Sequence, residues 1–162
     1  GMDPFNFADA LLGILAQRLG KRPCGACTKP HRATADQIKF VLTEYSGELM
    51  NTTTWKKDPV AATKALYAEW VKLFADDKGQ FTLYGPVGCE KCSGTGYRGR
   101  VGLHELLIGT DAVKKAIQEH ARVAELLAIC LEDGMHTLKQ DGMEKVLQGI
   151  TDMHQIRAVC IK

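Results

Sequence analysis

The chain has 162 residues, of which 45% are hydrophobic and 25% are charged, and its formal net charge is +2. This composition is typical of an ordinary folded protein with one or two small cores. A charge this close to neutral does not by itself indicate a polyanionic partner. The early apolar stretch is interrupted by Asp3, Asp9 and Arg18 and is too short for a bilayer, so it does not resemble a secretory signal. We therefore expect a cytosolic chain whose thiols stay reduced.

The first predicted element is an amphipathic helix within residues 1–21. Asp3-Pro4 is a helix-start signal, and the apolar residues that follow recur at spacings of three and four up to Gly20. These apolar residues are Ala8, Leu11, Leu12, Leu15 and Leu19.

Residues 34–80 are predicted to form a helical insertion. A capping box at Thr34 and Gln37 opens one helix, and Asp58 before Pro59 caps another. The apolar stripe of each helix indicates a core face rather than cofactor contacts.

The next segment, residues 81–103, is predicted to hold two small strands around a loop rich in glycine. Apolar residues alternate at Phe81 and Leu83 and again at Val101 and Leu103. The density of Gly and Pro between them is typical of a metal knuckle, where the backbone approaches sulfur closely and adopts positive φ.

The C-terminal part, residues 104–162, is predicted to be a helical domain. Its short apolar stripes end at Gly134 and Gly149, and Thr151 can cap a last helix. The predicted fold class is therefore mainly α, with a small β and zinc-knuckle element and a helical C-terminal bundle.

Two Cys-x-x-Cys pairs, Cys24/Cys27 and Cys89/Cys92, are the most informative feature of the chain. The spacing lets both sulfurs of a pair converge from one turn, while nearby amides point at them. Together the pairs predict one structural Zn²⁺ per chain, bridging two distant segments, 22–33 and 81–103. Closing the long loop between the pairs costs roughly 3–4 kcal/mol, which is less than the ~10–16 kcal/mol that structural zinc contributes.

Other interpretations of these cysteines are iron in a rubredoxin-like site, a redox dithiol, disulfides and unrelated buried thiols. The redox interpretation requires a Cys-x-x-Cys that opens a helix, whereas both pairs here lie among Gly and Pro. His31 could replace one sulfur, but two complete pairs already fill a tetrahedron, so we interpret it as an exposed loop histidine. Cys130 and Cys160 fall on apolar helical positions and are expected to be buried.

A zinc ion bound by four thiolates is anionic and needs cations and amide donors around it. Six basic residues lie close to the ligands in sequence and are predicted to supply that compensation. They are Lys21, Arg22, Lys29, Lys91, Arg98 and Arg100. The same residues, with Tyr97, also suggest an alternative, a nucleic-acid-binding zinc ribbon. The near-neutral net charge of the chain favours the first interpretation, in which they balance the charge of the metal centre.

Several catalytic motifs do not occur in the sequence. It has no Gly-x-x-x-x-Gly-Lys-Ser/Thr loop to bind nucleotide phosphates, no Gly-x-Ser-x-Gly and no His-Glu-x-x-His. His104 and Glu105 are adjacent, so on a strand they point to opposite faces, which favours a structural role. A closed four-thiolate site has no position for water, and we therefore expect no enzymatic activity in this chain.

The second knuckle and its continuation, residues 89–107, resemble the second zinc half-site of the GspE/PilB-type traffic ATPases of type II secretion and type IV pilus assembly. Residues 141–151 resemble the end of the same proteins, and Leu15-Ala16-Gln17-Arg18-Leu19 followed by Cys24 resembles their approach to the first half-site. The resemblance covers residues 3–33 and 81–162, and we find no motif in the segment 34–80.

The resemblance implies a zinc-binding C-terminal region that is separated from its ATPase domain, with the helix of residues 1–21 continuing from that domain. It implies a cytoplasmic position at the bacterial inner membrane, where the module helps couple ring motion to the platform protein. The partners expected on this basis are the ATPase domain, the inner-membrane platform protein and other secretion or pilus components. Neither membrane insertion nor nucleic-acid binding is expected. Residues 89–96 also resemble one zinc repeat of Hsp40-type chaperones, but those proteins use four repeats and this chain has one.

Overall fold

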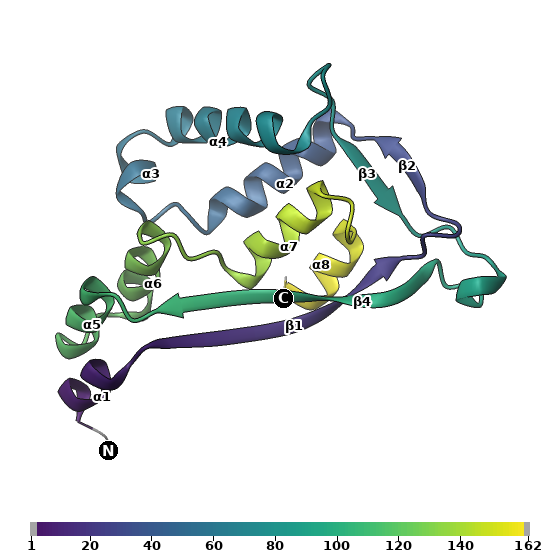
Figure 1. Ribbon diagram of the computed structural model, residues 1–162. Coiled ribbons are helices and arrows are strands. Elements are labelled where there is room, and N and C mark those ends of the chain that lie inside the picture. The colour runs from purple at the N-terminus through teal and green to yellow at the C-terminus, as the bar shows by residue number, and fades with distance from the viewer. Residues whose placement is uncertain (1–2, 161–162) are drawn as a thin grey trace.

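The computed structural model describes residues 3–160, about half of which are helical (Figure 1). The ends of the predicted ranges 1–21 and 104–162 therefore lie outside the described residues. In chain order the elements are α1 (Pro4–Ala10), β1 (Gly13–Pro23), β2 (Lys29–Arg32), α2 (Ala35–Gly47), α3 (Thr53–Lys57), α4 (Pro59–Phe74), β3 (Thr82–Gly85), the 3-10 turn η1 (Glu90–Cys92), β4 (Tyr97–Ile108), α5 (Asp111–Gln118), α6 (Val123–Glu132), α7 (Leu138–Leu147) and α8 (Met153–Cys160). None of the helices within residues 3–160 has both the length and the apolar character needed to cross a bilayer.

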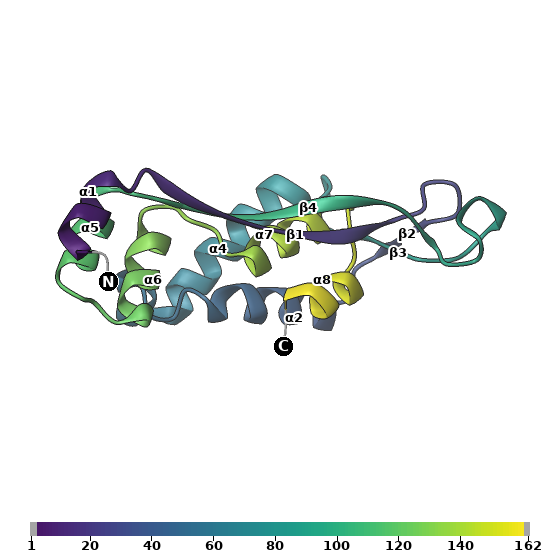
Figure 2. The same ribbon diagram turned by 90° about the horizontal axis from the view of Figure 1, so that it is seen from below.

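A long two-stranded ribbon of β1 and β4 organises the molecule. The strands are antiparallel and pair from Gly13 with Ile108 to Pro23 with Tyr97, with one irregularity between Lys21 and Pro23. Helices α7 and α8 pack against the ribbon, and α1, α5 and α6 gather at one of its ends (Figures 1 and 2). Its other end carries all four cysteines of the two pairs.

The predicted helix over residues 1–21 is wrong for most of its length. Asp3 does start a helix, its Oδ1 accepting from the Phe5 amide, but α1 ends at Ala10 and β1 follows. Leu15 and Leu19 are four residues apart, a spacing that places two side chains on one face of a helix and equally on one face of a strand, so the local pattern fits either. Pairing with β4, a segment distant in sequence, decides between them.

The two strands predicted within residues 81–103 are present as β3 and β4, but they do not pair with each other. β3 pairs with β2, a strand that the sequence analysis missed, from Lys29 with Gly85 to Arg32 with Thr82. β4 continues to Ile108, so the first residues of the predicted helical domain are strand. The Glu105 carboxylate, predicted to be structural, accepts from the Leu138 amide at the start of α7, at 2.9 Å.

The two helices predicted within the insertion are confirmed. The Thr34 and Gln37 capping box opens α2, and Asp58 Oδ1 accepts from the Ala61 amide at the start of α4. A short helix between them, α3, was not predicted.

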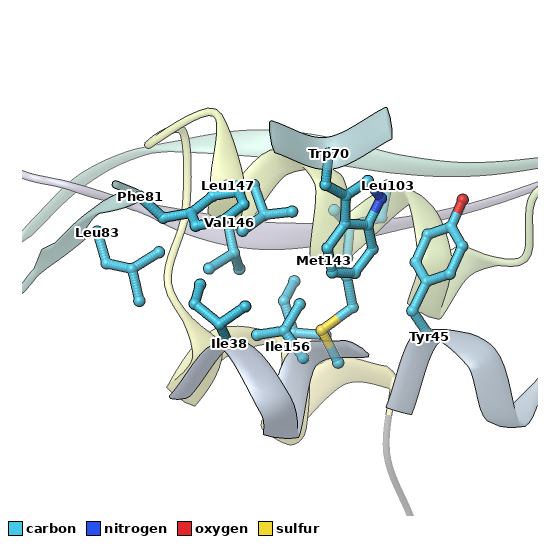
Figure 3. Close-up of a cluster of buried hydrophobic side chains, with 11 residues drawn as sticks. Ile38, Tyr45, Trp70, Phe81, Leu83, Leu103, Met143, Val146, Leu147 and Ile156 are labelled. Carbon is cyan, nitrogen blue, oxygen red and sulfur yellow. The ribbon is translucent and has the colours of Figure 1, made fainter. Parts of the chain in front are cut away.

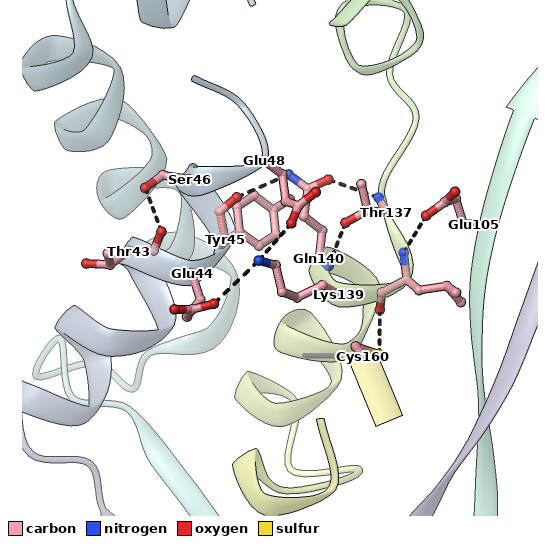
Figure 4. Close-up of polar contacts among 11 residues, drawn as sticks. Thr43, Glu44, Tyr45, Ser46, Glu48, Glu105, Thr137, Lys139, Gln140 and Cys160 are labelled. Atoms are coloured by element: carbon pink, nitrogen blue, oxygen red, sulfur yellow. Dashed lines mark hydrogen bonds and ion pairs between the residues drawn. The ribbon is translucent and has the colours of Figure 1, made fainter. Parts of the chain in front are cut away.

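The insertion docks on α7 through a polar cluster at the end of α2 (Figure 4). Lys139 Nζ lies 2.7 Å from Glu48 Oε1 and 3.4 Å from Glu44 Oε2, and Tyr45 Oη donates to Glu144 at 2.8 Å. Tyr45 also packs edge-on against Trp70 of α4, with ring centroids 5.1 Å apart.

Apolar packing is divided between two cores rather than gathered in one C-terminal bundle. The larger core joins α2, α4, β3, β4, α7 and α8 (Figure 3), and its residues are Ile38, Val41, Tyr45, Trp70, Phe81, Leu83, Leu103, Met143, Val146, Leu147 and Ile156. The smaller one, at the α1 end of the ribbon, holds Leu11, Val113, Cys130, Leu131 and Met135. The predicted bundle is therefore not confirmed, because α5 and α6 pack into a different core from α7 and α8.

The predicted helix ends in this region are mostly confirmed. Gly134 and Gly149, with φ of 96° and 75°, follow α6 and α7. The cap of α8 differs from the prediction, because the Asp152 carboxylate, not Thr151, accepts from the Gln155 amide at 3.0 Å.

We expect Leu103→Ala to lower the free energy of unfolding by about 3 kcal/mol, because it removes a fully buried side chain (0% exposed) from the larger core. The control is Leu106→Ala on the same strand, where the side chain is 49% exposed. Urea denaturation of both variants measures the difference. Equal losses would contradict the placement of Leu103 at the centre of the core.

Candidate metal centre

All four paired cysteines lie in the cysteine arm, which we define as residues 21–33 and 82–100. The arm comprises β2, β3, the adjoining ends of β1 and β4, and two loops that project beyond the helices (Figures 1 and 2). Each loop carries one cysteine pair.

The first pair lies in a tight turn directly after β1. The amides of Cys27 and Thr28 both donate to the Cys24 carbonyl, at 3.0 and 2.8 Å. Thr28 Oγ1 then donates to the Gly85 carbonyl at 2.9 Å, which ties the exit of the turn to β3. The Cys24 amide donates to the Gly96 carbonyl at 2.8 Å, so the first turn is bonded to the second.

Cys92 of the second pair lies in η1, and Cys89 directly precedes that turn. The loop around them, residues 88–96, contains glycines with left-handed backbone. Gly88 has φ of 110° and Gly96 has φ of 76°. A Cβ on Gly88 would lie 2.8 Å from the Gly94 carbonyl oxygen, and one on Gly96 would lie 2.5 Å from Pro86 Cβ. The loop therefore closes this tightly only because these two residues lack side chains.

The four sulfurs converge on one point. All four Sγ atoms lie within 4.8 Å of one another. The separation is 4.0 Å for Cys24 and Cys89, 3.9 Å for Cys27 and Cys92, and 3.7 Å for Cys89 and Cys92. These distances are far longer than a disulfide bond, and all four cysteines are free. The cluster could hold a metal ion.

Backbone amides point at the sulfurs, as expected for thiolates. The amides of Cys89 and Gly96 donate to Cys92 Sγ, each at 3.2 Å, and the Gly88 amide donates to Cys27 Sγ at 3.3 Å. Burial raises the pKa of Cys92, but the two amides and the neighbouring thiols more than offset it and lower the pKa to about 6. Burial is also the main cause that raises the pKa of Cys27, to about 11. Cys92 therefore loses its proton more readily than Cys27, and metal binding must displace the proton of the Cys27 thiol.

The remaining candidate ligands lie apart from the cluster. His31 is exposed on β2 and is not among the clustered residues. Cys130 is buried in the smaller core, as predicted, while Cys160 is only partly buried. The six basic residues predicted to compensate the centre are all exposed. That compensation stays a prediction.

A buried polar contact between α8 and the root of the arm was not predicted. Thr151 Oγ1 donates to the Lys21 carbonyl at 2.9 Å, and the Lys21 amide donates to Gln155 Oε1 at 3.1 Å. The backbone carbonyl and amide of Lys21, three positions before Cys24, are thus both held by side chains within α8 or just before it.

Asp152, in the segment between α7 and α8, lies near Tyr97 at the start of β4, just after the second knuckle. Burial raises the pKa of Tyr97 to about 12, and the Asp152 carboxylate adds to this rise. Tyr97 Oη and Asp152 Oδ2 are both buried and have no hydrogen-bond partner among the described residues. We call Thr151 and Gln155, with the Lys21 backbone that they hold, the α8 brace.

A family model described as "Type II/IV secretion system protein" matches residues 1–158. This chain belongs to that family. The match runs through the insertion, for which the sequence alone gave no motif, and it confirms the resemblance seen in the knuckles.

Three relatives illustrate the likeness. The type IV pilus assembly ATPase PilB of Thermus thermophilus is 33% identical over 165 residues, which covers 100% of this chain and 15% of the relative. The type II secretion system protein E of Dickeya dadantii is 35% identical, covering 96% of this chain and 24% of the relative. The type II secretion system ATPase E of Vibrio cholerae is 31% identical, covering 98% and 25%. The chain thus spans a quarter or less of the length of these relatives.

We predict that Gly96→Ala weakens metal binding by the cysteine cluster far more than Gly99→Ala. Both glycines have positive φ, so both variants carry the left-handed cost of about 1–2 kcal/mol. Only the first adds a clash, since a Cβ on Gly99 meets nothing within 4 Å. Titration with Co²⁺, followed by thiolate-to-metal absorption, should show weaker binding for Gly96→Ala. Equal affinities would contradict the role assigned to the close approach of Gly96 and Pro86.

The α8 brace is tested by Thr151→Val, which keeps the shape of the side chain and removes its hydroxyl. We expect faster amide hydrogen exchange over residues 20–28, and a stability loss of about 1–3 kcal/mol because the Lys21 carbonyl is left without its donor. Thr151→Ser retains the hydroxyl and is the control, with exchange close to that of the parent chain. If the valine and serine variants exchange alike, the hydroxyl does not hold the root of the arm.

Proposed function

We propose that this chain is the structural zinc module of a secretion or pilus traffic ATPase, with one Zn²⁺ bound by Cys24, Cys27, Cys89 and Cys92. The observation that carries the proposal is the spacing of the sulfurs. A regular tetrahedron with Zn–S bonds of about 2.3 Å has edges of about 3.8 Å. The three sulfur separations given above, 3.7 to 4.0 Å, match those edges.

The donor set also favours a structural rather than a catalytic ion. Four thiolates complete the coordination of Zn²⁺ and leave no position for water or substrate. The amides directed at Cys92 and Cys27 are the outer contacts that keep such ligands ionised. We therefore propose that the chain binds zinc without catalysing a reaction, and that the ATPase activity in the names of its relatives belongs to other parts of those proteins.

We further propose that the module couples motion of the ATPase to the inner-membrane platform protein, on the cytoplasmic side of the membrane. Membership of the secretion family supports the position at the inner membrane, and the contacts within the arm support the transmission of motion. An arm closed at its tip by a metal and held at its root by the α8 brace moves as one body, whereas a flexible loop would absorb a displacement. The partners proposed are the ATPase domain, the platform protein and other components of the same machine.

Metal analysis of the purified chain tests the zinc assignment. We expect about one zinc per chain, lost in Cys89→Ser together with cooperative unfolding, because removal of one ligand opens the tetrahedron. Cys160→Ser removes a thiol outside the cluster and is the matched control, which should keep its zinc. Full zinc retention in Cys89→Ser would contradict the four-thiolate site, and ATP turnover by the pure chain would contradict the structural role.

The coupling role is tested in the full-length ATPase that carries this region. We expect Cys89→Ser there to abolish pilus assembly or secretion while ATP hydrolysis by the isolated enzyme changes little. Normal assembly or secretion by that variant would contradict the coupling role while leaving the metal assignment intact.

A further inference from the structure

The charges of this chain are divided unevenly between the cysteine arm and the body. The arm contains seven Lys and Arg residues against a single acidic residue, Glu90, so its side chains sum to +6. Because the whole chain sums to +2, the rest of the molecule carries −4. The near-neutral total conceals a positive end and a negative end.

The seven cations of the arm form no ion pair within residues 3–160, although Lys21 Nζ lies 5.8 Å from the centroid of the Tyr97 ring. They are Lys21, Arg22, Lys29, Arg32, Lys91, Arg98 and Arg100, and all are exposed. The ion pairs found among residues 3–160 all lie in the body. A zinc ion with four thiolates adds a formal charge of about −2, which leaves the loaded arm strongly positive.

The arm presents most of this charge on a projecting surface, although Lys21 and Arg100 line a pocket of about 240 Å³. Lys91 lies in the second knuckle, and the other six cations lie on the adjoining parts of β1, β2 and β4. The two knuckle loops extend beyond the helices (Figure 2). Val87, two residues before Cys89, is exposed at 56% and is the one large hydrophobic side chain of the arm that is exposed. A diffuse set of long cationic side chains around one exposed apolar residue suits an extended anionic plane better than a shaped ligand.

We propose that the cysteine arm binds the surface of a bilayer containing anionic phospholipids, with Val87 at headgroup level and the acidic body turned away. Each Lys or Arg near such a surface strengthens binding by roughly fivefold, and repulsion of the negative body fixes the orientation. The inference rests on the proposed position of the module at the inner membrane, and it adds a lipid contact to the protein contact proposed there.

The first experiment is co-sedimentation of the zinc-loaded chain with vesicles. We expect binding to vesicles of mixed phosphatidylglycerol and phosphatidylcholine, no binding to phosphatidylcholine alone, and a steep decrease with salt because the Debye length shortens. Binding that is equal for both vesicle types, or absent at low salt, would overturn the proposal.

The decisive comparison uses two variants with the same net charge. The arm variant replaces Arg22, Lys29, Arg32 and Arg98 with Gln, and the body variant replaces Lys56, Lys57, Lys64 and Lys72 of α3 and α4 with Gln. All eight side chains are exposed and none makes a side-chain hydrogen bond or ion pair within the described residues. We expect the arm variant to bind the anionic vesicles at least about tenfold more weakly, and the body variant to bind as well as the parent chain or better. Equal losses would mean that total charge, not the arm, is responsible.

Zinc content and circular dichroism of both variants show whether they are folded before binding is compared.

Two further probes distinguish other polyanionic partners from lipid. Tight binding to double-stranded DNA without binding to vesicles would overturn the lipid proposal and favour a nucleic-acid partner. Tight binding to polyglutamate without binding to vesicles would overturn it in favour of an acidic protein. Failure of the vesicle assay leaves the coupling role untouched, since that role is read from assembly or secretion by the full-length ATPase.

Discussion

The pairing of β1 with β4 is the interaction on which the rest of this structure depends. Its last pair joins Pro23 to Tyr97, so the two knuckles leave the same end of the same ribbon, and the bond from the Cys24 amide to the Gly96 carbonyl continues the contact into the knuckles. The metal therefore does not have to close the long loop unaided, as an argument from the sequence alone assumes. Much of that entropy cost is already met by the ladder of backbone bonds and by the core beneath it, so the two cysteine pairs are close together before any metal binds.

Each half of the candidate site could be predicted from the sequence because each half is local. Cys-x-x-Cys fixes two sulfurs within one turn, and the glycines around Cys89 mark the left-handed backbone that such a turn requires. The helix caps at Thr34 and Asp58 are equally local, since cap and capped amide lie three residues apart. What these features have in common is that a window of a few residues contains the whole interaction.

The errors arise where the deciding partner is distant. Leu15 and Leu19 fit a helix and a strand almost equally, and only β4 resolves the choice. Thr151 has the chemistry of an N-cap, yet its hydroxyl is used by the Lys21 carbonyl, which leaves the cap to Asp152. The predicted C-terminal bundle fails for the same reason, because α5 packs into the smaller core and α7 into the larger one, a division that neither apolar stripe reveals by itself.

The position of the insertion explains how the metal centre tolerates it. β2 and β3 pair with each other, and Arg32 faces Thr82 across that pair, so the chain leaves and re-enters the arm at one place. Residues between those two points can lengthen at a small entropic cost without moving either knuckle. Their attachment is made elsewhere, by Lys139 of α7, which lies between Glu44 of α2 and Glu48 directly after that helix. The insertion therefore adds to the larger core and leaves the arm fixed by its own strands, by the bond between the two knuckles and by the brace from α8.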